Sequence, residues 1–386
     1  MYPLRSRRIK AATVVAAAAG LLIAGCSSSK TNTSGQASTT PTTSPSSTDQ
    51  GTSTSPSAVS SAGAQQTVAA SATSAACTSD TYAGGVPKLD ISNPGAITVG
   101  FSQSESTSNP FRATETKSIT DEAKAEGFKL IQRNANANVQ QQNTDIEAMI
   151  AQGAQFLIVA PENSDGLAPA LAQAKAKHIP VLTIDRTVNG AACQDFIAFI
   201  GSNFLQQAQI AADDLGAALN GTGSVAILEG TSGNNVATDR TNGFKQELQA
   251  KYPNIKIVAD QTANFDEATG QKVTEQFLQS NPDLTGIYAE NDGMALGAIQ
   301  AIKAAGKTPG KDIKIVSIDG IQQIVQGVVD GTVVADVETN PRFGPLAFES
   351  LKNFYNGTGV TTPVIIKDHH FTKDNAAAAM KNGDVY

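Results

Sequence analysis

Residues 96–132 read AITVGFSQSESTSNPFRATETKSITDEAKAEGFKLIQ, and this stretch decides the fold class. It opens with the β-branched run AITVGF at 96–101, which predicts a strand. An Asn-Pro pair begins the next stretch and a Gly ends it, which predicts a helix over 109–127. Residues 128–132, FKLIQ, then predict a second strand. A strand, a helix and another strand in this order form the repeating unit of a parallel α/β sheet.

The same alternation continues along the chain and restarts after a strand at 196–200. The other expected strands lie at 156–160, 180–184, 224–228, 255–259, 286–289, 313–318 and 333–337. The other expected helices lie at 139–152, 167–174, 203–219, 237–250, 267–280, 292–305 and 321–329. Continuous apolar strands separated by helices are typical of parallel sheets that are covered on both faces. The predicted fold class is α/β, with two doubly wound parallel-sheet domains.

Polar side chains and phenylalanines recur just after the expected strands, where doubly wound sheets bind ligands. They are Asn109, Phe111, Arg112, Asp185, Arg186, Asn234, Asn235, Arg240, Asn264, Phe265, Asp266, Asn291, Asp292, Asp319 and Glu338. Carboxylates and amides pair with vicinal hydroxyls, Arg donates a planar fork, and Phe covers the apolar face of a sugar ring. Each residue alone also fits a structural role, such as the helix cap for Asn109. Their joint recurrence predicts a sugar site.

Several motifs in this order resemble the type I periplasmic sugar-binding proteins of ABC importers, the group with ribose-, allose- and galactofuranose-binding proteins. The matching stretches are NPF at 109–111, LTIDR at 182–186, DR at 239–240 with GF at 243–244, FD at 265–266, NDGMALGAIQA at 291–301 and SIDG at 317–320. The resemblance implies the type I periplasmic-binding-protein fold, with two domains that close on a monosaccharide and a hinge of three crossovers. It also implies an ABC permease as partner, no cofactor, no metal and no catalysis.

The resemblance further implies which residues contact the sugar. Those of the first domain are Asn109, Phe111, Arg112, Asp185 and Arg186, and those of the second are Asn235, Arg240, Phe265, Asn291, Asp319 and Glu338. Ribose binders carry a second Phe at the position of Arg112, whereas galactofuranose binders carry an aromatic residue followed by Arg. This position favours a galactose-like or furanose sugar. The expected ligand is a monosaccharide, either galactofuranose-like, a pentose or a hexose. An insertion of about one residue relative to the galactofuranose type leaves 104–108 outside the predicted ligand set.

The expected domain limits follow from crossovers near 201–203, 338–340 and 368–371. The first domain would comprise 95–201 and 340–368, and the second 202–339 and 369–386. We expect the protein to act as a monomer.

Three other functions compete with sugar import. A glycosidase would use two of Asp185, Asp292, Asp319 and Glu338 as acid and base. A sugar-responsive regulator would need a basic helix-turn-helix before the fold, where this chain has a neutral Ser/Thr-rich stretch. A sensor would present the same sugar to a signalling receptor. The adjacent His369 and His370 lack further spaced ligands, so we expect no metal there.

The N-terminus predicts export and a lipid anchor. Residues 1–25 contain four basic residues, no acidic residue and an apolar run of 14 residues at 11–24, as in a signal peptide. The run ends in LIAGC, which resembles the lipobox of bacterial lipoproteins and implies cleavage before Cys26 and acylation of its thiol. The alternative is an ordinary secretory signal that happens to meet a Cys, and an Arg7-Arg8 pair leaves the export route open between the general and the twin-arginine pathway. The expected location is the extracytoplasmic face of the cell membrane.

Residues 26–85 are expected to form a disordered tether. Of the 50 residues at 27–76, 26 are Ser or Thr and none is Leu, Ile or aromatic, so this segment cannot bury a core. A flexible chain of this length reaches roughly 40 Å. The whole chain has a formal charge of −7, and taking away the four positive charges of 1–25 gives −11. This acidic balance argues against nucleic acid as a partner.

The three cysteines are expected to have two different roles. With Cys26 lipidated, Cys77 and Cys193 remain as an even pair in an exported protein, so we expect them to form a disulfide. Two free thiols are the alternative.

Overall fold

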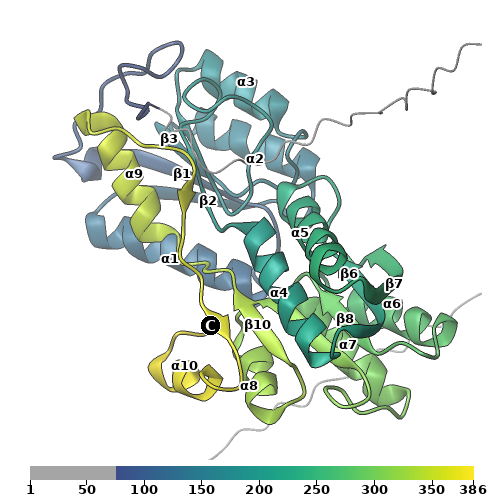
Figure 1. Ribbon diagram of the computed structural model, residues 1–386. Coiled ribbons are helices and arrows are strands. Elements are labelled where there is room, and N and C mark those ends of the chain that lie inside the picture. Colours follow the sequence, from purple (N-terminus) through teal and green to yellow (C-terminus); the bar gives the residue numbers. More distant parts are fainter. Residues whose placement is uncertain (1–74) are drawn as a thin grey trace, which may run out of the picture. The chain divides into compact units, whose positions relative to one another are not determined.

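The first of two six-stranded sheets is entirely parallel, with the strand order β11-β5-β4-β3-β1-β2 (Figure 1). The computed structural model describes residues 75–386. The strands of this sheet are β1 Thr98–Gln103, β2 Lys129–Asn134, β3 Phe156–Val159, β4 Val181–Ile184, β5 Phe199–Gly201 and β11 Val364–Ile365. All four residues of β3 are buried, because alternate side chains point to opposite faces and helices cover both faces.

The second sheet has the order β12-β10-β9-β8-β6-β7 and is parallel except for β12, which runs antiparallel to β10. Its strands are β6 Thr222–Glu229, β7 Asn254–Thr262, β8 Gly286–Ala289, β9 Lys314–Asp319, β10 Ala335–Glu338 and β12 His370–Phe371. The predicted α/β fold with two parallel-dominated sheets is therefore confirmed.

Helices sandwich each sheet, and each sheet with its helices forms one lobe. In the first lobe α1 (Pro110–Glu126) packs beside α9 (Gly344–Asn356), and α2 (Val139–Ala151) packs beside α3 (Ala168–Ala176) on the other face. In the second lobe one face carries α4 (Phe204–Ala218) and α5 (Asn235–Lys251). The other face carries α6 (Glu267–Ser280), α7 (Asp292–Ala304), α8 (Gln322–Asp330) and α10 (Ala376–Asn382). A short 3₁₀ helix, Pro94–Ala96, precedes β1.

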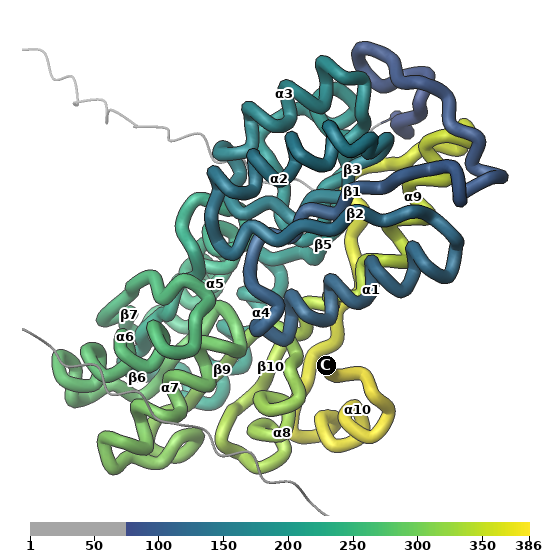
Figure 2. Tube along the Cα trace, turned by 180° about the vertical axis from the view of Figure 1, so that it is seen from behind, coloured from purple at the N-terminus to yellow at the C-terminus, as the bar shows by residue number. Residues whose placement is uncertain are grey.

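The chain passes between the lobes three times, after β5, after β10 and after β11 (Figure 2). One carboxylate joins the three crossing segments. Asp368 Oδ1 accepts hydrogen bonds from Ser202 Oγ at 3.0 Å and from the Asn340 amide at 3.1 Å, and its Oδ2 accepts from Gln207 Nε2 at 2.9 Å. We call Ser202, Gln207, Asn340 and Asp368 the hinge cluster. Because Asp368 holds a residue of each neighbouring crossover, the three segments are mechanically linked.

The folded part begins before the boundary predicted at residue 85. Cys77 forms a disulfide with Cys193 and exchanges backbone hydrogen bonds of 2.8 and 2.9 Å with Val360. Tyr82 is 4% exposed and packs edge-on against Phe354 with the ring centres 5.8 Å apart. An aromatic side chain and a covalent bond thus fix this segment to the first lobe, although the predicted tether included it.

The expected signal peptide (1–25), Cys26 and most of the tether lie outside the described residues. Between residues 75 and 386 no helix has the length and apolar character needed to cross a membrane.

Candidate sugar-binding site

A cavity with an empty volume of about 300 Å³ lies between the two lobes. This volume includes space that is open to solvent. Its first wall comes from the first lobe: Glu105, Asn109, Phe111, Arg112, Asp185 and Arg186. Its second wall comes from the second lobe and its crossover: Val236, Arg240, Phe265, Asn291, Asp319 and Thr339.

The start of α1 positions three residues of the first wall. Asn109 caps the helix by accepting a hydrogen bond from the Phe111 amide at 2.9 Å, and the Pro at the first helical position fixes the entry angle. The Phe111 ring is held by the edges of Phe343 at 6.4 Å and Tyr386 at 6.2 Å. The Arg112 guanidinium lies 4.9 Å from the centre of the Phe111 ring. The capped start of α1 therefore places both the Phe111 ring and the Arg112 guanidinium at the cavity.

Three cavity residues adopt a backbone conformation that is unusual without glycine. Asp185 follows β4 with φ of 60°, Phe265 follows β7 with φ of 56°, and Asp319 ends β9 with φ of 145°. Positive φ costs free energy in residues with a Cβ, and such strain concentrates at functional sites. The three side chains are thereby turned from the sheet edges into the space between the lobes.

A network of ion pairs fixes the first wall. Arg112 Nη1 lies 2.7 Å from Asp185 Oδ2 and 2.9 Å from Glu115 Oε2. Glu105 joins Arg112 to Arg186, with its Oε2 at 3.2 Å from Arg112 Nε and its Oε1 at 2.5 Å from Arg186 Nη2. Arg186 Nη1 also lies 3.3 Å from Glu162 Oε2. Both guanidiniums of this wall are held by carboxylates.

In the second wall, the Arg240 guanidinium donates most of its hydrogen bonds to neutral oxygens. Arg240 Nη2 donates to Thr339 Oγ1 at 2.6 Å, and Nε and Nη2 donate to Gln207 Oε1 at 3.3 and 3.2 Å. Its Nη1 donates to the backbone carbonyl of Glu290. The carboxylate facing it is Asp319, with Oδ1 at 3.3 Å. Arg240 therefore has fewer charged partners than Arg112 and Arg186 of the first wall.

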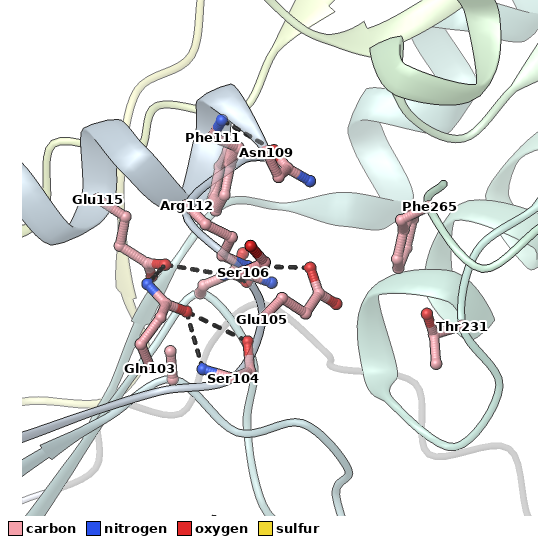
Figure 3. A network of polar contacts seen from close by, with 12 residues as sticks. Gln103, Ser104, Glu105, Ser106, Asn109, Phe111, Arg112, Glu115, Thr231 and Phe265 are labelled. Atoms are coloured by element: carbon pink, nitrogen blue, oxygen red, sulfur yellow. Dashed lines mark hydrogen bonds and ion pairs between the residues drawn. The ribbon is translucent and has the colours of Figure 1, made fainter. Parts of the chain in front are cut away.

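A second phenylalanine faces the cavity from the second lobe. Figure 3 shows Phe265 on the opposite side from Phe111, Asn109 and Glu105, and the Arg186 guanidinium lies over the Phe265 ring, 5.6 Å from its centre. Asn291 caps α7 by accepting from the Met294 amide at 3.0 Å, and its Nδ2 donates to the Phe265 carbonyl at 3.4 Å. A ring-shaped ligand between the walls would therefore meet an aromatic residue on two sides.

The carboxyl groups around the cavity differ in pKa, because burial raises the pKa and neighbouring arginines lower it. Burial opposes ionisation of Glu105, but the Arg186 and Arg112 guanidiniums outweigh it and lower the pKa to about 2. Burial raises the pKa of Glu115 and of Glu162 to about 7, and that of Asp319 to about 6, in each case against the opposing effect of a neighbouring arginine. Glu105 is therefore the carboxylate that stays ionised most firmly in this group.

Nine of the eleven predicted ligand residues line the cavity together. The other two lie elsewhere. Asn235 Oδ1 accepts a hydrogen bond from the Thr187 amide of the opposite lobe at 2.9 Å, at the rim of the cavity. Glu338 is buried at the hinge, where it accepts from the His369 amide at 3.0 Å and contacts the His369 ring and Arg342. Their side chains are occupied by protein partners.

Sequence reasoning missed Glu105, Val236 and Thr339. Glu105 lies in the segment 104–108, which was left outside the ligand set because of the insertion. Its acidic side chain at the carboxyl end of a strand was the available signal. Thr339 directly follows Glu338, and in the closed lobes Thr339, not Glu338, lines the cavity.

The lobes touch at the rim. Besides the bond between Thr187 and Asn235, the Ser164 amide donates to the Gly233 carbonyl at 2.9 Å. The structure is therefore that of closed lobes. No three His, Cys, Asp or Glu side chains of residues 75–386 are grouped so that they could hold a metal ion.

With this geometry established, comparison with known proteins identifies the family. A sequence profile described as "Periplasmic binding protein domain" matches residues 99–358. The chain belongs to this family. The galactofuranose-binding protein YtfQ of Escherichia coli (strain K12) is 35% identical over 262 residues, covering 67% of this chain and 82% of that protein. The ribose import binding protein RbsB of Bacillus subtilis (strain 168) is 33% identical over 269 residues, covering 69% and 85%.

A solved family member contains a furanose sugar. The periplasmic binding component of the arabinose ABC transporter of Shewanella sp. ANA-3, bound to α- and β-L-arabinofuranose, is 37% identical, with a TM-score of 0.70 and coverage of 74% of this chain and 95% of that one. The resemblance to type I sugar-binding proteins of ABC importers is thus confirmed, and these relatives are binding proteins.

Proposed function

We propose that this protein is the extracytoplasmic sugar-binding component of an ABC importer and that it binds a monosaccharide between its lobes without chemical change. The observation that carries the proposal is the cavity between Phe111 and Phe265, into which three guanidiniums, two carboxylates of the strand ends and two amides converge. Such groups exchange paired hydrogen bonds with sugar hydroxyls while the rings cover apolar C–H faces.

Closure is the proposed mechanism of capture. A ligand that contacts both walls stabilises only the closed arrangement, so binding shifts the equilibrium between open and closed lobes. The rim bonds between the lobes add to closure, and the hinge cluster joins the three segments that must bend. A micromolar affinity, about −8 kcal/mol, suits capture and later release to a permease.

The sugar class is proposed from the relatives. YtfQ, RbsB and the arabinose-binding component bind, by their names, galactofuranose, ribose and arabinofuranose. We propose a galactofuranose-like sugar, a pentose or a hexose for this chain.

A thermal-shift screen over pentoses, hexoses, furanose sugars and polyols tests the proposal. A ligand that binds only the folded protein must raise its melting temperature. We expect one sugar to do so and mass spectrometry to recover that sugar unchanged from a stoichiometric complex. No shift with any sugar would contradict sugar binding, and a cleaved or isomerised product would instead support the glycosidase alternative.

Attachment to the membrane is proposed from the sequence alone. Acylation of Cys26 would tether the binding domain through residues 26–76, since two or more acyl chains anchor a protein stably. We expect Cys26→Ala to release the protein from the membrane fraction and to abolish labelling by a fatty-acid analogue. Unchanged membrane retention and labelling would contradict it.

A further inference from the structure

Glu105 occupies an unusual place for a residue outside the predicted ligand set. It lies in the loop after β1, where its carbonyl accepts a hydrogen bond from Asn134 Nδ2 at 2.7 Å. Its side chain, 13% exposed, enters the cavity and touches both Arg112 and Arg186. Figure 3 shows it in the space between Arg112 and Phe265. A ligand bound between the lobes would therefore meet the Glu105 carboxylate directly.

The balance of charge in the cavity determines what the Glu105 carboxylate can do to a ligand. Three arginines line it, and a guanidinium fork matches a carboxylate or phosphate in shape and charge. Such a set alone would favour an anionic ligand. In this protein the forks already face five carboxyl groups: Glu105, Glu115, Glu162, Asp185 and Asp319. The arginines therefore leave no net positive charge for a ligand once these acids are ionised.

Glu105 differs from the other four in its contacts. It alone bridges two of the cavity's arginines through both of its oxygens, with Arg112 on one and Arg186 on the other. Its pKa of about 2 also means that it stays ionised under ordinary conditions, whereas burial raises the pKa of Glu115 and Glu162 to about 7. A ligand carboxylate would have to displace Glu105 from the arginines or lie beside its charge.

We propose that Glu105 makes the site selective for uncharged sugars and excludes the corresponding sugar acids. This inference rests on the proposed sugar-binding function and specifies its substrate class. A neutral sugar donates its hydroxyls to the Glu105 carboxylate while the ion pairs persist, because a carboxylate oxygen accepts more than one hydrogen bond. The carboxylate of a sugar acid has no proton to donate to Glu105, so the two carboxylates repel each other and compete for the same guanidiniums.

Calorimetric titration with matched pairs of probes tests the inference. Each pair matches a sugar with its uronate, which keeps the ring and adds only the charged group. The pairs are D-galactose and D-galacturonate, D-glucose and D-glucuronate, and the sugar identified in the thermal-shift screen with its own uronate. We expect the wild-type protein to bind the neutral member of at least one pair at least 100-fold more tightly than the acid. We expect Glu105→Gln to reduce that ratio at least tenfold, mainly by strengthening binding of the acid.

Controls separate charge from structure. Glu105→Asp keeps the charge and should preserve most of the selectivity, while Glu275→Gln, an exposed substitution on α6, should leave both affinities unchanged. Wild-type protein that binds an acid as tightly as its neutral partner overturns the inference even if Glu105→Gln does not fold. An unchanged ratio in folded Glu105→Gln overturns it as well. If no sugar of the thermal-shift screen binds and the wild type binds neither member of any pair, the proposed function itself is contradicted.

Discussion

The two walls of the cavity hold their arginines in different ways. In the first wall, carboxylates surround Arg112 and Arg186, and these bonds stay within the first lobe. In the second wall, Arg240 is held mainly by neutral oxygens, one of which belongs to Gln207 of the hinge cluster. The first wall is therefore a fixed charged surface, whereas the second connects the ligand site to the moving part of the fold.

This connection is continuous. Gln207 accepts from Arg240 and donates through its amide nitrogen to the Glu338 carbonyl at 2.9 Å and to Asp368 Oδ2 at 2.9 Å. A ligand that moves Arg240 thus acts on a residue bonded to the second and third crossovers. We expect substitutions in the second wall to alter closure, and those in the first wall to alter ligand choice and charge.

The largest effect should come from Arg240→Ala. This change removes a ligand donor and leaves Asp319, Thr339 and Gln207 without their shared partner, which costs about 2 kcal/mol or more in sugar affinity, roughly a 30-fold rise in Kd. Calorimetry with the sugar found in the thermal-shift screen measures it. Lys251→Ala, at the end of the same helix and exposed, is the control. Wild-type affinity in Arg240→Ala would remove the second wall from the site.

The next prediction is that carboxyl groups of the two walls change the free energy of unfolding over different pH ranges. Burial raises the pKa of Glu162, behind the first wall, to about 7, so its ionisation opposes folding above that pH. The wild-type free energy of unfolding should fall as pH rises from about 4.5, the ordinary pKa of Glu, to about 7 and should level off above that, whereas Glu162→Gln avoids this loss. The stability gap between the two proteins should widen by on the order of 1–3 kcal/mol from pH 5 to pH 8.

Urea denaturation at several pH values measures this gap, with the exposed Glu147→Gln as control. The same comparison for Asp319→Asn in the second wall should change at lower pH, from about 3.8 to about 6, because burial raises the pKa of Asp319 to about 6. Coincident pH profiles for the two variants would contradict the distinction between the walls.

The elements that form the lobes were predictable because they are long and apolar on both faces. The strand–helix–strand unit at 96–132 appears as β1, α1 and β2, with the predicted cap at Asn109. The crossovers after residue 337 were predicted, but the helices and strands there were not. There β11 and β12 have two residues each, too few to show a pattern, and the seven-residue α10 contains four consecutive alanines. The two strands are defined by tertiary pairing with β5 and β10 rather than by their own sequence.

The candidate site was predictable at the level of strand ends, but individual contacts were not. Asn109, Asp185 and Asn291 reach the cavity because caps and strand ends direct them there. Asn235 stands beside Val236, and in the closed lobes the amide turns to the rim while the apolar neighbour lines the cavity. Which of two adjacent residues faces a site depends on the packing of the opposite lobe, which the local sequence does not encode.

A smaller effect tests the link to the hinge. Gln207 does not line the cavity, yet Gln207→Met should weaken sugar binding by about 1 kcal/mol, since it removes the acceptor for Arg240 and a donor to Asp368. Small-angle scattering should show a larger fraction of open protein at a given sugar concentration. The exposed neighbour Gln206→Ala is the control. If Gln207→Met binds and closes like the wild type, Arg240 acts only as a ligand contact and the walls differ less than we infer.

The smallest effect concerns the rim. Asn235→Ala removes one neutral hydrogen bond to the Thr187 amide, and Asn234 still caps α5, so we expect a loss of about 0.5–1 kcal/mol in affinity. Because Asn235 lies outside the cavity, this loss should be the same for every sugar that binds, as expected for a change in closure alone. Calorimetry with two or more sugars measures it. A loss that differs between sugars by more than the error would mean that Asn235 touches the ligand, as the sequence first suggested, and that the rim belongs to the second wall.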